Sequence, residues 1–583
     1  MVKKLAASIR QYKKASILAP LTVVVEVLME ILIPLIMAEL IDRGIDKGNM
    51  EAVWLYGILL LVAAIISLIF GALAGKYAAI ASSGFARNLR HDMYYKIQEY
   101  SFANIDKFST SSIITRLTTD VTNIQNAYQM LLRMAVRCPV MLVFAMIVSF
   151  GIDAQLSLVF LCAIPFLGFG LWLIMSRVHP IFERVFKTYD KLNRIVQENL
   201  RGIRVVKSFT REDFEINKFE DVSQAIYKDF SKAEKTLAFN MPLMQFSMYA
   251  CTLIVCWFGA RAIVACGGDA ATGLSTGEFL SLITYAAQIL MSLMAVSMVF
   301  VMITISRASA ERIAEILDEE SSLSNCDNPI HEVKDGSIVF DDVVFSYSKK
   351  NEKPVLDHIN LNIKSGQTIG ILGGTGSSKS SLVQLIPRLY DVSSGRVTVG
   401  GVDVREYDIE SLRNQVAMVL QKNELFSGTI KDNLRWGNEN ATDEEMVRVC
   451  KLACADEFVS TFPKGYDTYI EQGGTNVSGG QKQRLWIARA LLKKPKILIL
   501  DDSTSAVDTK TDAMIRKAFR EEIPDTTKII IAQRVSSVQD ADQILVLDDG
   551  KLMAHGTHEE LLESSPIYKE VYYSQNKGGS INE

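Results

Sequence analysis

Six long apolar runs are the feature that most constrains how this chain folds. Each is long enough for a helix of about 20 residues to cross the hydrocarbon core of a bilayer. None recurs after Ala310. The inner connections, 81–128 and 177–237, are rich in Lys and Arg, as is typical of cytoplasmic loops. The sequence therefore predicts six spans with both termini in the cytoplasm, at roughly 16–40, 54–80, 129–151, 155–176, 238–264 and 279–305.

The two long inner connections keep an amphipathic helical period and contain few Gly or Pro residues. We therefore expect the spans to continue into the cytoplasm as long helices that turn near 104–119 and 208–219. Residues 1–15 place apolar side chains on one face and basic ones on the other. That pattern favours an interfacial elbow helix along the inner leaflet, with a frayed polar tail as the alternative.

Composition excludes several classes of protein. The chain has 583 residues, of which 49% are hydrophobic and 22% charged, so it is neither disordered nor membrane-embedded throughout. A net charge of −4 gives no polyanion-binding signature, and we expect no nucleic-acid partner. The eight cysteines show no paired metal-ligand spacing and indicate reduced structural thiols.

The pattern changes after residue 320. A polar, charged stretch at 321–336 indicates a linker, and short β-branched runs then alternate with amphipathic helical segments to the end of the chain. Alternation of this kind predicts an α/β domain over 337–583 with a largely parallel sheet. The expected strands include 337–345, 368–372, 497–500, 528–531 and 543–547.

A glycine-rich turn follows the apolar run 368–372 and leads into a helical segment. Strand, glycine-rich turn and helix start together predict a phosphate-binding loop, in which backbone amides bind nucleotide phosphates. Lys379 would neutralise the terminal phosphates, and the Ser380 hydroxyl would ligate Mg²⁺. The residues of this loop are Gly373, Gly374, Thr375, Gly376, Ser377, Ser378, Lys379, Ser380 and Ser381.

Two further segments belong to the same chemistry. The apolar run 497–500 ends in Asp501 and Asp502, as magnesium-dependent phosphoryl transfer requires, and Asp501 would hold the metal through water. A serine and two glycines at the start of another helix predict a second anion site. That segment consists of Val477, Ser478, Gly479, Gly480 and Gln481.

These motifs, in this order behind six spans, resemble those of an ATP-binding cassette (ABC) exporter half-transporter over nearly the whole chain. The resemblance implies an all-α six-helix transmembrane domain at 16–320 and an α/β P-loop nucleotide-binding domain at 337–583. It implies ATP and Mg²⁺ as cofactors. It further implies that Tyr347 stacks on adenine and that Gln421 senses the metal as a third ligand beside Ser380 and Asp501.

The resemblance also implies communication between sites. The segment 505–508, which ends at Asp508, would connect the two nucleotide sites of a dimer. Turns near 111–119 and 208–213 look like the coupling helices that dock on nucleotide-binding domains.

Three positions depart from the family pattern. Asp502 stands where hydrolysing members carry glutamate, and its carboxylate is one methylene shorter. Gln533 replaces the switch histidine and cannot exchange a proton near neutral pH. Ser378 replaces the second fixed glycine of the loop. Asp502 and Gln533 are thus the catalytic positions, and a misplaced base loses much of the roughly 10²–10⁴-fold that general-base catalysis contributes.

A weakened catalytic set beside a nearly intact signature predicts a heterodimer. In this family each ATP lies between one subunit's phosphate loop and the other's signature, so this chain would supply the degenerate site. Its partner would be a different half-transporter that carries the catalytic glutamate and hydrolyses ATP against the signature of this chain. The alternatives are a homodimeric exporter of lipid or peptide and an ATP-gated regulatory or channel subunit.

The membrane half suggests the cargo only broadly. Methionines at helical spacing in the fifth and sixth spans favour hydrophobic or amphipathic small molecules, as in multidrug-type export, although core packing explains each singly. Glu26 and Glu30 lie one turn apart in the first span, and Arg133 and Arg137 do so in the third. A structural ion-pair ladder and a cation-binding role both fit. By resemblance, the chain is expected in the lipid bilayer of a bacterial inner membrane.

Overall fold

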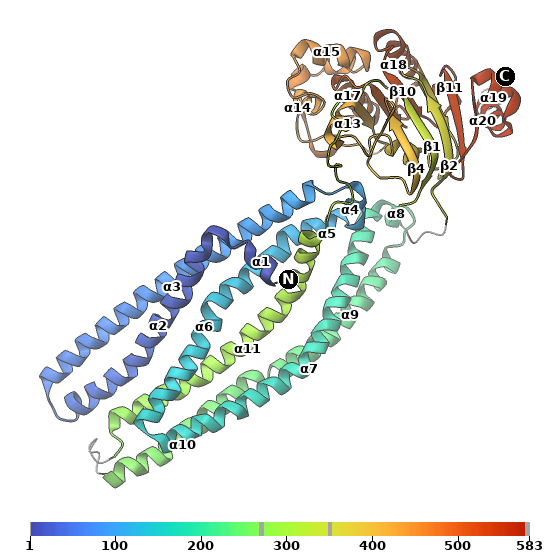
Figure 1. Cartoon of the computed structure of the whole chain (residues 1–583). Coiled ribbons are helices and arrows are strands. Elements are labelled where there is room, and N and C mark those ends of the chain that lie inside the picture. The colour runs from blue at the N-terminus through green and yellow to red at the C-terminus, as the bar shows by residue number, and fades with distance from the viewer. Residues whose placement is uncertain (1, 267–272, 348–352, 422, 578–583) are drawn as a thin grey trace. The chain divides into compact units, whose positions relative to one another are not determined.

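The computed structural model describes residues 2–266, 273–347, 353–421 and 423–577. The chain forms two compact units. The first comprises Met1–Gln98 and Thr110–Glu319, and the second comprises Glu99–Ser109 and Glu320–Glu583. The first is all helical and the second contains every strand of the described residues (Figure 1). The predicted division into a helical membrane domain and an α/β domain is confirmed.

The first unit contains six helical segments that are long and apolar enough to cross a membrane. The helices run side by side for much of their length (Figure 1). Several extend well beyond the roughly 20 residues that a bilayer needs, as their inner connections predicted. The main helices are α2 (Lys13–Leu40), α3 (Met50–Gln98), α6 (Val121–Ile152), α7 (Ala154–Arg201), α9 (Glu212–Leu237), α10 (Asn240–Cys266) and α11 (Thr276–Asp318).

The amino-terminal segment packs on α3 through side-chain hydrogen bonds between residues far apart in the sequence. After α1 (Val2–Ala7), Ser8 donates its hydroxyl to Asp92 at 2.7 Å, and its carbonyl accepts from the Asn88 side chain at 2.8 Å. Tyr12 lies directly against Gly84, where a Cβ would be 2.4 Å from its ring. A short 3-10 turn at Arg10–Tyr12 then joins this segment to α2.

The charged residues inside the spans form one compact cluster. Arg137 of α6 lies between two carboxylates of α2, donating to Glu30 at 2.7 and 2.8 Å and also to Glu26. Glu26 is 7% exposed. Within the described residues, Arg133 makes no ion pair and instead approaches Gly75 of α3. The geometry favours the structural ion pair over cation binding, with Arg137 alone as the counter-charge.

The second unit is built on a six-stranded sheet in the order β12-β11-β3-β10-β9-β6. The four pairings from β11 to β6 are parallel, and β12 is antiparallel to β11. Its inner strands are buried runs such as Ile497–Asp501, as helices on both faces require. The strands are β3 (Thr368–Leu372), β6 (Val416–Val419), β9 (Ile497–Asp501), β10 (Thr527–Ile531), β11 (Gln543–Asp548) and β12 (Lys551–Gly556).

The helices of this unit are short, and several begin at a side-chain cap. A Ser, Thr or Asp precedes most of them and accepts a hydrogen bond from the first turn, which satisfies amides that have no helical partner. The longer ones are α12 (Lys379–Gln384), α13 (Ile409–Gln415), α14 (Ile430–Arg435), α15 (Asp443–Leu452), α17 (Gly479–Leu492), α18 (Thr509–Glu522), α19 (His558–Ser564) and α20 (Pro566–Lys577).

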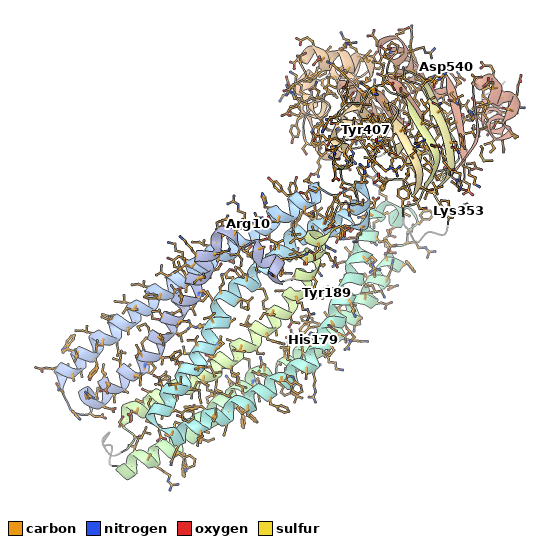
Figure 2. The ribbon with its side chains drawn as sticks, viewed as in Figure 1. Arg10, His179, Tyr189, Lys353, Tyr407 and Asp540 are labelled. Atoms are coloured by element: carbon orange, nitrogen blue, oxygen red, sulfur yellow. The ribbon has the colours of Figure 1, made fainter. Side chains whose placement is uncertain are left out.

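A second sheet, which the sequence did not predict as separate, is antiparallel. Its order is β2-β1-β4-β5, and its first strand in the chain, β1 (Ile338–Phe345), pairs with both neighbours. Tyr407, labelled in Figure 2, is fully buried beside it and donates its hydroxyl to the Val399 carbonyl at 2.9 Å. The other strands of this sheet are β2 (Leu356–Ile363), β4 (Ser394–Val399) and β5 (Val402–Asp403).

The predicted position of the first coupling helix is wrong. We expected 111–119, but the short helix that belongs to the second unit is α4 (Phe102–Lys107), whereas Thr110 and its successors belong to the first unit. Ser101 caps α4, and Asn104 donates to the Glu320 carbonyl at 2.9 Å and accepts from the Ser322 amide at 3.1 Å. Polar capping, rather than apolar periodicity, fixes this segment, so the periodic pattern did not reveal it.

Candidate nucleotide-binding site

The predicted phosphate loop connects the centre of the parallel sheet to a helix. It leaves the carboxyl end of β3 at Gly373 and enters α12 at Lys379. A Cβ on Gly373 would lie 2.2 Å from the Leu547 carbonyl oxygen, so only glycine fits there. Gly374, Thr375 and Gly376 are exposed, and Gly376 has φ +85°. The exposed amides at a helix start suit anion binding.

Ser378 adopts the left-handed backbone that glycine usually provides. Its φ and ψ are +68° and +22°, directly before α12. A non-glycine residue in this region costs roughly 1–2 kcal/mol, because Cβ crowds the carbonyl. The departure seen in the sequence therefore stores strain in the loop without removing its amide donors.

The Lys379 side chain lies over the loop, with its ammonium group beside the backbone where phosphate is expected to bind. Its ammonium donates to the carbonyls of Gly373 and Gly374 at 2.8 and 2.7 Å and to the buried Ser377 hydroxyl at 3.1 Å. Burial lowers the pKa of this lysine, and Asp501 and Asp502 oppose that shift. An incoming phosphate would therefore compete with neutral acceptors only.

Asp501 lies beside Ser380, where the metal ion is expected to bind. It is 3% exposed at the end of β9 and hydrogen-bonds the Ser380 side chain. Burial raises the pKa of its carboxyl, with the neighbouring Asp502 adding to the shift. A buried carboxylate beside a hydroxyl provides the hard oxygen donors that Mg²⁺ prefers.

Asp502 is held by two amide side chains. Its Oδ2 accepts from Gln533 Nε2 at 2.9 Å and from Gln421 Nε2 at 3.5 Å. Burial raises the pKa of Asp502, and the two glutamine hydrogen bonds oppose the rise. The residue has φ +48°, a left-handed backbone conformation that is strained for a residue with a side chain. The structure thus brings the three residues of the predicted catalytic and metal-sensing set together.

Tyr347 lies beside the loop, as a base-stacking residue would. Its hydroxyl and that of Ser381, on α12, are 2.8 Å apart, and the residue is 47% exposed. Phe345 and Tyr390 meet this ring edge-on at centroid distances of 4.8 and 5.1 Å. The exposed face can accept a planar base.

The signature residues begin α17 through a complete capping box. Ser478 Oγ accepts from the Gln481 amide at 3.3 Å, and the Ser478 amide donates to Gln481 Oε1 at 2.9 Å. Val477 is buried in the core below. Gly479 and Gly480 then leave the first turn without side chains, so its amides are accessible to an anion.

The same helix start packs tightly on the segment 505–508. A Cβ on Gly480 would lie 2.8 Å from the Ala506 carbonyl oxygen, whereas one on Gly479 would make ordinary contact at 3.5 Å. Asp508 caps α18, accepting from the Thr511 amide at 2.9 Å, and this hydrogen bond lowers the pKa of its carboxyl. Asp508 therefore has a structural role that is independent of any communication between sites.

The predicted residues form two groups. We call 373–381 with Tyr347, Gln421, Asp501, Asp502 and Gln533 the phosphate end, and 477–481 with 505–508 the signature end. In the described part of the chain, no hydrogen bond joins signature residues 477–481 to loop residues 373–381.

Sequence reasoning gave no role to Gln483. This residue is 7% exposed on α17, donates to Ser505 Oγ at 3.2 Å and accepts from the Ala506 amide at 2.9 Å. It fixes the signature end internally. The signal was a polar residue four positions after Gly479, on a face whose next members, Trp486 and Ile487, are buried.

Comparison with known proteins now identifies the architecture. Residues 16–293 match the ABC transporter transmembrane region, and residues 356–505 match the ABC transporter domain. The uncharacterized ABC transporter ATP-binding protein YfiB of Bacillus subtilis is 37% identical over 98% of both chains. The chain belongs to the ABC transporter family.

Further similarities agree with the ABC transporter fold. An ATP-dependent lipid A-core flippase of Desulfotalea psychrophila is 33% identical, covering 92% of this chain and 93% of that protein. The structure of a bacterial Atm1-family ABC exporter with ATP bound superimposes with a TM-score of 0.82 at 24% identity, over 97% of this chain and 99% of that chain. The predicted multi-pass membrane location with a cytoplasmic nucleotide-binding domain is confirmed, and the ABC ATPase domain implies ATP binding.

Proposed function

We propose that this ABC transporter exports hydrophobic or amphipathic small molecules and is the degenerate-site half of a heterodimer. The observation that carries the proposal is the contrast at Asp502. Its short carboxylate is engaged by two amides, Gln533 and Gln421, and among the described residues no imidazole hydrogen-bonds it to exchange a proton. The signature end, by comparison, has a complete cap, and Gly480 packs tightly on the Ala506 carbonyl.

The phosphate end fits a magnesium-bound nucleoside triphosphate. The loop amides and Lys379 bind phosphate oxygens, while Ser380, Gln421 and Asp501 hold the metal. ATP with Mg²⁺ supplies the phosphoanhydride bond whose hydrolysis drives transport. Asp502 is the base that takes a proton from water, and its reach is one methylene short, so turnover at this site is slow.

The signature end acts on the partner's nucleotide. Ser478 and the amides of Gly479 and Gly480 contact phosphates held by the partner's loop, and the partner's own glutamate performs hydrolysis there. Gln481, which is committed to the Ser478 amide, keeps the cap rigid. Asp508 and the rest of 505–508 then transmit the state of one site to the other.

Two exposed apolar surfaces support an assembly of two subunits. At the cytoplasmic turn between α7 and α9, Val205, Phe209 and Phe214 are 58%, 73% and 60% exposed. In the nucleotide-binding domain, Phe426 and Trp436 stack at 4.2 Å and are 47% and 65% exposed. Apolar patches outside the bilayer are typical of protein interfaces.

An apolar hollow supports hydrophobic cargo. A cavity of about 480 Å³ opens between α7 and α10 in the membrane domain. Phe166 and Phe246 meet across it at a ring distance of 6.5 Å, and Cys162 and Ile254 add further apolar surface. A site with so few polar groups selects by size and hydrophobicity.

A homodimeric lipid exporter is the second candidate. The 33% identical relative from Desulfotalea psychrophila is named as a lipid A-core flippase, which favours amphipathic cargo with a large headgroup. In that case Asp502 and Gln533 sustain all hydrolysis. An ATP-gated channel subunit differs from both because it only equilibrates its cargo, whereas an exporter accumulates it in vesicles.

The test is the subunit composition of the native complex. We expect the tagged chain, purified from its native membrane and measured by intact native mass spectrometry, to carry a different half-transporter at one-to-one stoichiometry. A dimer of this chain alone would contradict the heterodimer. Radiolabelled ATP should then be retained at the Lys379 site for longer than at the partner's site, and equal loss from both would contradict the asymmetry.

A further inference from the structure

The carboxyl-terminal helix α20 reaches the segment that carries Gln533. Gln575 Nε2 donates to the Gln533 carbonyl at 2.8 Å, and Gln575 Oε1 accepts from the Val535 amide at 2.8 Å. One side chain therefore bonds the backbone on both sides of Arg534. Only one orientation of the carboxamide satisfies both bonds, because a carbonyl needs a donor and an amide needs an acceptor.

The position of Gln575 follows from how α20 is anchored. Tyr568 is 1% exposed, and its hydroxyl lies 2.6 Å from His558 Nδ1. Val571 and Tyr572 pack against the same core. Residues 568, 571, 572 and 575 share one helical face at the spacing i, i+3, i+4 and i+7. The packed face of α20 thus ends in the polar side chain of Gln575, which hydrogen-bonds the segment 533–540 that begins at Gln533.

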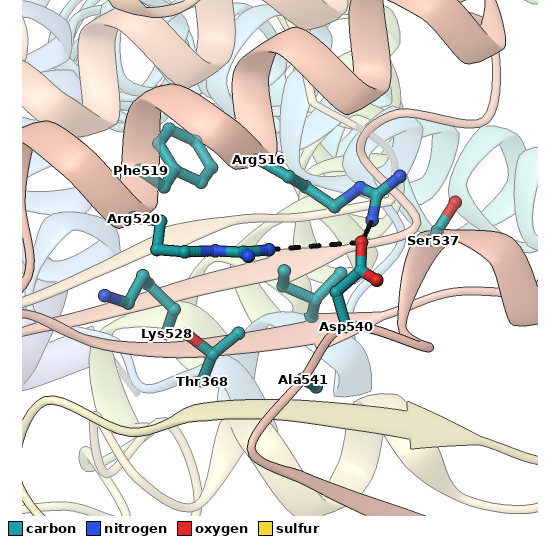
Figure 3. Close-up of a pocket in the computed structure, with 9 residues that line it drawn as sticks. Thr368, Arg516, Phe519, Arg520, Lys528, Ser537, Asp540 and Ala541 are labelled. Atoms are coloured by element: carbon teal, nitrogen blue, oxygen red, sulfur yellow. Dashed lines mark hydrogen bonds and ion pairs between the residues drawn. The ribbon is translucent and has the colours of Figure 1, made fainter. Parts of the chain in front are cut away.

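The other side of this segment is tied to α18. Ser537 donates its hydroxyl to Asp512 at 3.1 Å, and Asp512 is 5% exposed. Arg516 links onward to Asp540 at 2.9 Å, with Arg520 at 3.9 Å from the same carboxylate (Figure 3). Residues 533–540 therefore lie between two fixed supports, α20 through Gln575 and α18 through Asp512 and Arg516.

We propose that Gln575 is a positioning residue for the nucleotide site. By fixing the backbone at Gln533 and Val535, it holds the Gln533 amide against Asp502, so the carboxyl-terminal helix sets the geometry of the phosphate end. The inference rests on the proposed function, since it assigns Gln533 to that site. Gln575 lies outside the phosphate end as defined above, and its effect on that end passes through Gln533.

The experiment uses the purified native complex in lipid nanodiscs. We compare the wild type with Q575A, Q575E, Q533A and the double variant Q533A/Q575A. The matched control is S574A, on the same helix beside Gln575. The readouts are the rate at which retained radiolabelled ATP leaves this chain's site, the KM for ATP, and hydrogen exchange at the Val535 amide.

We expect Q575A to accelerate both ATP loss and Val535 exchange by on the order of tenfold, because two backbone hydrogen bonds are lost. The KM for ATP should stay within about twofold, since the phosphate loop is untouched. Q575E keeps the acceptor for Val535 and loses the donor to Gln533, so it should preserve exchange protection and still release ATP faster. S574A should match the wild type.

The double variant separates positioning from general stability. If Gln575 acts through Gln533, Q533A/Q575A should release ATP at the same rate as Q533A. Additive effects, or wild-type ATP retention in Q575A beside a changed Q533A, would overturn the positioning role alone. Wild-type retention in Q533A would instead overturn the proposed function of the phosphate end, and the positioning role with it.

Discussion

In the phosphate end, two residues with full side chains hold left-handed backbone angles, whereas the signature end is built from glycines and an unstrained helix cap. Ser378 and Asp502 have φ values of +68° and +48°. Ser478 sits at φ −69° and ψ 162°, the ordinary geometry of a cap. One chain therefore carries a strained phosphate end and an unstrained signature end. The difference supports unequal roles for the two sites of a dimer.

Restoring the family residues in the phosphate end should have the largest effect. The double change D502E/Q533H lengthens the base and supplies a proton-exchanging partner, so hydrolysis at this site should rise by about 10²-fold or more. The measurement is ATPase activity in a complex whose partner lacks its own catalytic glutamate.

The single variant D502E is the control. It should gain less, because Gln533 still occupies the hydrogen-bonding position beside the carboxylate. If the double variant gave no gain, Asp502 and Gln533 would not be the residues that limit hydrolysis at the phosphate end. The proposed functional difference between the two ends would then be contradicted.

The substitution G480A, which adds a methyl group to the signature end, should lower ATPase activity at the partner's site. In G480A the new Cβ would lie 2.8 Å from the Ala506 carbonyl oxygen, so the helix start must shift. We expect ATPase activity at the partner's site to fall by about tenfold or more, measured in a complex that carries K379A in this chain. G479A, whose Cβ meets Ala506 at 3.5 Å, should fall less. Equal losses would show that packing on 505–508 is unimportant.

Relieving strain in the phosphate loop should have a moderate effect. S378G removes a side chain at φ +68°, and we expect a gain of about 1 kcal/mol in loop stability and tighter ATP binding by roughly fivefold. Thermal unfolding of the complex with and without ATP measures both. The matched variant G376A, at φ +85°, should change both quantities in the opposite direction. A loss of affinity in S378G would mean that the serine contributes a contact.

Substitutions in the membrane domain should not change the difference between the phosphate end and the signature end. E30Q and E26Q each weaken the contact with Arg137, and we expect less assembled transporter for E26Q, which is the more buried. Cationic dye transport per assembled complex and the ratio of the two ATP sites should stay unchanged. Altered dye selectivity in both variants would restore the cation-binding role.

Local pattern was enough to predict most of the fold. The six spans follow from length and hydropathy, and the parallel core follows from buried β-branched strands such as β9. The antiparallel sheet was not separated, because β1 carries β-branched residues as the parallel strands do, although its residues are not all buried as those of β9 are. The position of α4 depends on hydrogen bonds from Asn104 to residues more than two hundred positions away, which no window of sequence contains.

The candidate site divides in the same way. Ser378 and Asp502 stand out in the sequence because a fixed motif surrounds them, so their departure is visible without coordinates. Gln483 and Gln575 belong to no motif and act through backbone atoms of distant segments. Their roles depend on tertiary placement, and a helical-face argument identifies them only after the partner segment is known.

The attachment of α4 has a consequence for how the protein is made. Tyr390 donates to Asp106 at 2.6 Å, across 284 positions of sequence. At about 5–20 residues per second, a ribosome needs roughly 15 to 60 s to travel that distance. During that interval the second and third spans are already synthesised, but Asp106 lacks the hydroxyl from which it later accepts. Because the second unit includes 99–109 as well as the carboxyl-terminal part of the chain, that unit is completed only after the helices that flank 99–109 have been made.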